Sequence, residues 1–289
     1  MKNFKFIDHP QITLWVILIS IVVSIVISEI FLGGMLGLSG NDPYSNFLRS
    51  LSAHLILVFL IIPFLLGLPK GNRNFKTYLD DIRLTNTGQF TRLLLIALSS
   101  YLILVLCQSL GSIVYRFLEG EPVNLNFIIS VINIKGDLPP ESLSLLTSLP
   151  SAFEELVFRG VLLTFFLLIY SKRKAIIFSS FGFSIIHLLN LVSGRDPVWV
   201  AGQLVWTFLL GIFYGYLFIQ TGSLLPNMLF HYISNAFVGT FNYYINSTAS
   251  VEIQALYGII FTFGILPVFL MIIWIKYFTS RWPFTNRIK

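Results

Sequence analysis

The amino-acid sequence predicts an all-α, polytopic membrane helical bundle, with about eight transmembrane helices around a polar intramembrane cavity. Of the 289 residues, 55% are hydrophobic and only 11% are charged. The mean hydropathy is +0.81. A soluble domain carries about 25% charged residues to solvate its surface. This composition therefore excludes a soluble enzyme, a disordered chain and a nucleic-acid-binding module, and it makes the lipid bilayer the expected environment.

Eight apolar runs are long enough to cross a bilayer core, which needs about 20 helical residues. Pro150 and Pro226 suit the first turns of two of these helices, where the N–H that proline lacks has no partner. The run at 124–133 is too short to cross, so we expect it at the membrane interface. No internal repeat occurs, and residues 1–289 are predicted to form a single integral membrane domain. The eight spans are 12–32, 51–68, 93–117, 150–170, 175–192, 198–219, 223–245 and 255–277.

The distribution of lysine and arginine predicts cytoplasmic termini. If the eight spans alternate in direction, 14 of the 19 Lys and Arg residues fall on the side of the termini, among them Arg83, Lys172 and Arg287. Four fall on the other side, and Arg159 lies within a span. Because positive loops stay on the cytoplasmic side, we expect a multi-pass protein of the cell (cytoplasmic) membrane.

Five ionisable residues lie deep inside the predicted spans, and Asn235 joins them as a strong hydrogen-bonding group. Each ionisable group at the bilayer centre costs at least about 2.5–3.5 kcal/mol on insertion scales, so each is a candidate functional residue. His54 and Glu29 lie near span ends that water can reach, and we expect both to be structural. The six candidates are Glu154, Glu155, Arg159, His187, His231 and Asn235.

Helical spacing separates the two adjacent glutamates. Glu155 and Arg159 are four residues apart, so they share a face and can form an ion pair. Glu154 points about 100° away from Glu155 and stays free for other work. The alternative interpretation is that Glu154, Glu155 and Arg159 form one buried structural network.

The histidines lie on two further spans. His187 shares a helix face with Phe183, and it would serve either as a packing residue or as a site residue. His231 and Asn235 are four apart and face the same way, which also suits an interhelical hydrogen bond. Since every unpaired polar group in lipid costs several kcal/mol, we expect the three spans to converge on one polar cavity.

The chemistry of this set favours activation of water. A glutamate, two histidines and an amide supply a general base, a second proton carrier and donors to an oxyanion. The set Glu154, His187 and His231 could instead hold a divalent metal such as zinc, and a metal-free mechanism is equally compatible with the spacing. No G-x-S-x-G motif is present. Water activated by a carboxylate is therefore the expected nucleophile.

Three segments in order, EELVFRG, FSIIH and GIFYGYLFIQTGSLLPNMLFHYISN, resemble the motifs of the CPBP (Abi) family. This family contains the CAAX prenyl endopeptidases and bacterial bacteriocin-processing and self-immunity proteins. The resemblance covers a motif core at 150–240 and implies an eight-helix intramembrane protease. It implies that Glu154 and His187 activate water, that His231 and Asn235 stabilise the oxyanion, and that Glu155 and Arg159 support the site. Members are described both as metalloproteases and as metal-free glutamate proteases.

Three functions are compatible with these observations. The first is an endopeptidase that cuts a membrane-associated or lipid-modified peptide or protein. The second is a non-catalytic Abi-type membrane protein that acts by binding, in bacteriocin self-immunity or regulation. The third is a transporter with a proton relay, which would predict repeated halves that the sequence lacks. The intact motif set favours the endopeptidase.

Overall fold

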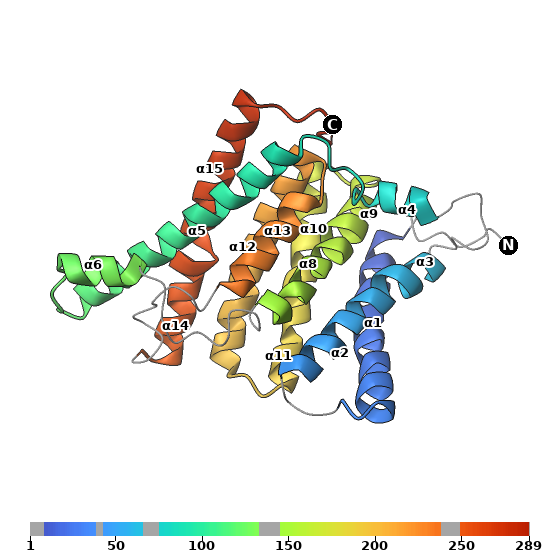
Figure 1. Ribbon diagram of the computed structural model, residues 1–289, viewed down its shortest axis with the longest axis horizontal. Helices are drawn as coiled ribbons and strands as arrows, with labels where there is room; N and C mark the ends of the chain where they lie inside the picture. Colours follow the sequence, from blue (N-terminus) through green and yellow to red (C-terminus); the bar gives the residue numbers. More distant parts are fainter. Residues whose placement is uncertain (1–8, 39–42, 66–74, 133–144, 238–248, 289) are drawn as a thin grey trace.

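The computed structural model describes residues 9–38, 43–65, 75–132, 145–237 and 249–288. Within these ranges all regular structure is helical, and six helices are long and apolar enough to cross a membrane. The structure therefore confirms the class of a multi-pass helical membrane protein (Figure 1). The six candidate spans are Ile12–Met35, Tyr44–Leu65, Phe90–Leu118, Lys172–Val192, Pro197–Thr221 and Val251–Arg281.

The other two predicted spans differ from these six. The first is one continuous helix that carries three charged residues, Glu154, Glu155 and Arg159, and so is less apolar than a typical span. It is built from α8 (Leu149–Glu155), η5 (Leu156–Leu163) and α9 (Thr164–Leu167). The second, α13 (Leu225–Ala236), has 12 residues, and the rest of the predicted span 223–245 lies outside the described residues after Phe237. The count of eight stays a prediction.

The N-terminal half forms two paired helices and one long one. The second helix begins at Pro43, before the predicted start at 51, because its first two turns are polar and hydropathy does not detect them. The predicted short run at 124–133 is an eight-residue helix, α6. The elements are α1 (Pro10–Ser28), η2 (Glu29–Met35), α2 (Pro43–Ile56), η3 (Leu57–Ile61), α3 (Ile62–Leu65), α4 (Phe75–Asp81), α5 (Phe90–Leu118) and α6 (Leu125–Ile132).

The C-terminal half supplies the remaining long helices. As predicted, Pro150 and Pro226 lie in the first turns of α8 and α13. Asp196 caps α12, since its carboxylate accepts hydrogen bonds from the backbone N–H groups of Val198 and Trp199. The further elements are α10 (Lys172–Ile185), η6 (Ile186–Leu188), α11 (Leu189–Val192), α12 (Pro197–Thr221), α14 (Val251–Tyr257), η8 (Gly258–Thr262) and α15 (Ile265–Arg281).

Helices α8, α10, α12 and α13 lie together in the middle of the bundle, with α1 and α2 at one edge and α14 and α15 at the other (Figure 1). Helices α10 and α12 pack closely against each other at Gly211. A Cβ placed on Gly211 would lie 2.7 Å from the Cβ of Ser180, so only glycine permits this contact. Gly211 is therefore a packing residue between α10 and α12. Buried aromatic side chains of α12 and α13, including Phe213, Tyr214 and Phe230, pack against one another in the core.

Several loops that the charge count places on one side meet at one end of the molecule. The backbone N–H of Ile288 donates to the carbonyl of Ile219 at 3.1 Å, and Lys172 Nζ donates to the carbonyl of Ile288 at 3.0 Å. The side chain of Asn86 donates to the carbonyl of Gly222, at the turn after α12. The side chain of Asn286 donates to that of Asn86, which joins the α4–α5 loop to the C-terminal segment as well. Which side of the membrane this end faces stays a prediction.

Candidate functional site

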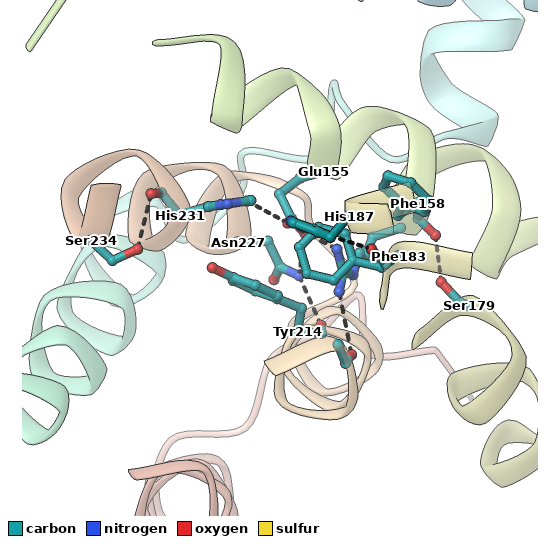
Figure 2. A network of polar contacts seen from close by, with 11 residues as sticks. Glu155, Phe158, Ser179, Phe183, His187, Tyr214, Asn227, His231 and Ser234 are labelled. Atoms are coloured by element: carbon teal, nitrogen blue, oxygen red, sulfur yellow. Dashed lines mark hydrogen bonds and ion pairs between the residues drawn. The ribbon is translucent and has the colours of Figure 1, made fainter. Parts of the chain in front are cut away.

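Glu155 is the centre of a buried polar network that joins three helical segments (Figure 2). Both Glu155 and Arg159 are fully buried, and Arg159 Nη1 donates to Glu155 Oε1 at 2.9 Å. His231 Nδ1 lies 2.9 Å from the same oxygen. Asn227 Nδ2 donates to Glu155 Oε2 at 3.4 Å and to the carbonyl of Tyr214 at 2.8 Å. The structure therefore shows the predicted ion pair between Glu155 and Arg159.

Aromatic rings surround the guanidinium of Arg159. Its Cζ lies 4.4 Å from the ring centroid of Phe183 and 4.6 Å from that of Tyr214. Both distances are within the range of a favourable cation–π contact, which gains strength in a desolvated setting. Arg159 Nη2 also donates to the carbonyl of Gly211 at 3.4 Å. One buried charge thus links η5 to both α10 and α12.

Glu154 has different surroundings from its neighbour. Its side chain is half-buried, and no hydrogen bond ties its carboxylate to any described residue. It lines a cavity of about 250 Å³ together with His187. The remaining lining residues are Ile21, Ser24, Ile25, Ala53, His54, Leu57, Val157, Phe158, Ile186, Leu189 and Asn190. Two adjacent carboxylates therefore divide into one that holds helices together and one that faces an open space.

The ring of His187 is oriented by its own helix. Its Nδ1 lies 2.8 Å from the carbonyl oxygen of Phe183. A carbonyl oxygen can only accept, so Nδ1 carries the hydrogen and Nε2 is the nitrogen left with a lone pair in the neutral ring. The ring of Phe183 packs edge-on against His187, with centroids 5.2 Å apart. His187 is thus held as a proton acceptor on the wall of the cavity.

His231 is oriented in the same way by Glu155. A carboxylate accepts, so Nδ1 of His231 carries the hydrogen and Nε2 keeps its lone pair while the ring is neutral. The rings of Phe183 and His231 pack edge-on at 5.9 Å, which puts Phe183 in contact with both histidines. His231 is not among the residues that line the cavity of Glu154. Asn235, one turn further along α13, is exposed and makes no hydrogen bond with any described residue.

Two residues at the site escape the sequence argument. Asn227 lies four positions before His231, so the same spacing that links His231 to Asn235 also puts Asn227 on that face of α13. His54, which we expected to be structural, lines the cavity with Glu154 and His187. Only the packing of α2 against α8 brings it there, and no spacing within one helix could reveal this.

The helices depart from regular α geometry at the site. Segment η5, which follows Glu154 and Glu155 directly and carries Arg159, is π-helical. Segment η6, which carries His187, is a 3₁₀ turn. The altered backbone of η5 is supported from outside, since Ser179 Oγ donates to the carbonyl of Phe158 at 2.7 Å (Figure 2). Such irregular segments occur often at functional sites.

The orientation of the two histidine rings suits metal binding, but the positions of the candidate ligands do not. Both histidines present Nε2 while Nδ1 is held by an oxygen, which is the usual arrangement for a histidine that binds metal. Yet nowhere in the described ranges do three or more His, Cys, Asp or Glu side chains gather as a metal ion requires. The set Glu154, His187 and His231 is therefore not assembled as a ligand set here.

Comparison with known proteins identifies the part of the chain that carries this site. No curated protein and no solved structure matches the chain. A family model, described as type II CAAX prenyl endopeptidase Rce1-like, matches residues 141–237, about a third of the chain. This segment spans α8 to α13 and so includes Glu154, His187 and His231. Residues 141–237 therefore resemble the Rce1-like type II CAAX prenyl endopeptidases of the CPBP family.

Proposed function

We propose that this protein is an intramembrane endopeptidase that hydrolyses a peptide bond of a membrane-associated or lipid-modified peptide or protein, with Glu154 as the base that activates water. The family of residues 141–237 is one of CAAX-protease-like endopeptidases. The observation that carries the assignment to Glu154 is the contrast between the two adjacent glutamates. Glu155 is fully buried and holds Arg159 and His231, whereas Glu154 faces the cavity beside His187.

The first step is the attack of water. Glu154, whose carboxylate is free of hydrogen bonds to described residues, takes one proton from a water molecule in the cavity. Nε2 of His187 accepts a hydrogen bond from the same water and so orients its oxygen. The hydroxide forms a bond to the carbonyl carbon of the substrate, and the carbonyl oxygen becomes an oxyanion. A base positioned in this way contributes about 10²–10⁴-fold to the rate.

His231 and Asn235 are the proposed donors to the oxyanion. A neutral His231, whose one hydrogen is on Nδ1, can only accept through Nε2. Nε2 can donate to an oxyanion only when it also carries a proton. Glu155 and Arg159 thus act as positioning residues, because Arg159 fixes the Glu155 carboxylate and that carboxylate holds His231 in one orientation.

The test is cleavage by the detergent-purified full chain. Two fluorogenic peptides of the same sequence serve as substrates, one with an isoprenyl group on a cysteine near its C-terminus and one without. We expect Glu154→Gln to lower kcat about 100-fold or more, with an unchanged melting temperature, since Glu154 makes no hydrogen bond that holds the described fold together. The matched control is Glu252→Gln, at an exposed carboxylate of α14. Parallel assays with and without a chelator report whether a divalent metal contributes.

Two outcomes contradict the proposal. Equal cleavage by wild type and Glu154→Gln would assign the activity to another residue or to a contaminating protease. A folded, monodisperse wild type that cleaves neither peptide would favour the Abi-type protein that acts by binding.

A further inference from the structure

The cavity of Glu154 contains a third titratable side chain. His54 lines it together with Glu154 and His187, and the other lining residues carry no ionisable group. His54 belongs to α2, outside the matched residues 141–237. The domain alone therefore does not complete the cavity, because α1, α2 and η3 supply six of its lining residues: Ile21, Ser24, Ile25, Ala53, His54 and Leu57.

The ring of His54 is held in one orientation by its own helix. Its Nδ1 lies 2.7 Å from the carbonyl oxygen of Ser50. Since this oxygen can only accept, Nδ1 carries the hydrogen, and Nε2 is the nitrogen left to act in the cavity. A second proton on Nε2 leaves the bond to Ser50 intact. His54 can therefore gain and lose a proton without moving, as an acid–base catalyst must.

The cavity has two walls of different origin. The segments α8, η5, η6 and α11 form one wall and carry Glu154 and His187. The segments α1, α2 and η3 form the other wall, and His54 is its one titratable side chain. A peptide bond between these walls would receive water from the first wall and present its leaving nitrogen to the second.

We propose that His54 is the general acid that protonates the leaving amine of the scissile peptide bond, an inference that rests on the proposed endopeptidase function. When the tetrahedral intermediate collapses, the bond from carbon to nitrogen breaks and its electron pair goes to the nitrogen. The proton on Nε2 of His54 moves to that nitrogen, and the product leaves as an amine. The proton that Glu154 took from water then returns His54 to its protonated form, directly or through cavity water. The second proton of the water stays on the new carboxyl group, so the atoms and charges balance.

The other cationic and imidazole groups near the cavity already have contacts or roles of their own. Arg159 and His231 both bind Glu155 and are not among the residues that line the cavity, and His231 is already assigned to the oxyanion. His187 lies on the same wall as Glu154 and is used to orient water. Of the described residues that line the cavity, His54 is thus the proton donor that the mechanism does not otherwise employ.

The experiment compares two scissile bonds in one peptide sequence. One substrate has the natural amide, and the other has an ester with an acidic phenol as leaving group. The amine must be protonated to leave, whereas the phenolate leaves without a proton. We expect His54→Gln to lower kcat for the amide about 100-fold and to leave ester hydrolysis unchanged. Glu154→Gln should lower both rates, since water attacks in both reactions. His9→Gln, at the exposed histidine before α1, is the matched control and should change neither.

The ester also reports folding within the same sample, so a misfolded variant is recognised by the loss of both activities. A second variant, His54→Asn, guards against a defect particular to glutamine. If both His54 variants are folded by melting temperature and lose amide and ester hydrolysis in parallel, or lose neither, the proposal is overturned. A wild type that hydrolyses neither substrate would instead overturn the endopeptidase function itself.

Discussion

Substitution of Glu155 by glutamine tests whether the buried network depends on charge. The variant keeps the shape of the side chain but leaves the fully buried Arg159 without its carboxylate. Three hydrogen bonds reach Glu155, from Arg159, His231 and Asn227. An average hydrogen bond between membrane helices contributes about 0.6 kcal/mol, so the loss of all three would lower the free energy of unfolding by about 2 kcal/mol. An uncompensated buried charge costs about 3–5 kcal/mol instead.

We expect Glu155→Gln to lower the free energy of unfolding by the larger of these two values, about 3–5 kcal/mol. Glutamine can still accept from Arg159 through its oxygen, but its amide group would face the amide nitrogen of Asn227, and two donors cannot bond each other. The reference is Glu29→Gln, which removes the carboxylate from a 3.0 Å ion pair with Arg49 in which the Glu29 side chain is 52% exposed. A pair of that kind contributes about 0–1 kcal/mol.

The assay is the free energy of unfolding in mixed micelles, followed with a thiol-reactive fluorophore. The single cysteine, Cys107, is buried and reacts only when the bundle opens. The double variant Glu155→Gln, Arg159→Met should recover part of the loss, because it no longer buries an unpaired charge. If Glu155→Gln destabilises the protein no more than Glu29→Gln does, the network is not an electrostatic anchor and this reasoning fails.

Three further predictions concern packing, catalysis and topology. Gly211→Ala should destabilise the bundle by about 1–3 kcal/mol, because its Cβ would press against the backbone of α10, whereas Gly34→Ala, with open space around it, should not. Asn235→Ala should lower kcat by about 10²–10³-fold if it donates to the oxyanion, at an unchanged melting temperature because this side chain is exposed. In a cysteine-free background, a membrane-impermeant thiol reagent should label a cysteine at Glu121 in intact cells and one at Thr85 only after lysis.

Most of the membrane helices can be predicted from the sequence because the bilayer is a uniform solvent. Apolar runs of sufficient length must become helices in lipid, where each backbone group needs an internal partner. This is why six of the eight expected spans agree with helices of the structure. The pair of Glu155 and Arg159 was equally predictable, because four residues within one helix fix the relative position of two side chains.

Hydropathy and spacing within one helix do not predict the contacts between helices. Spacing indicated that Glu154 and Glu155 point in different directions. Only the packing of the helices shows that Glu155 contacts His231 on α13 and that Glu154 lines a cavity. His54 looked like a residue at a wet helix end until the packing of α2 on α8 brought it beside Glu154. Sequence alone thus determined the membrane class, most helices and the local ion pair, since these depend on hydropathy and on neighbours within one turn. The tertiary structure decided which polar groups share the cavity, because that depends on how separate helices pack.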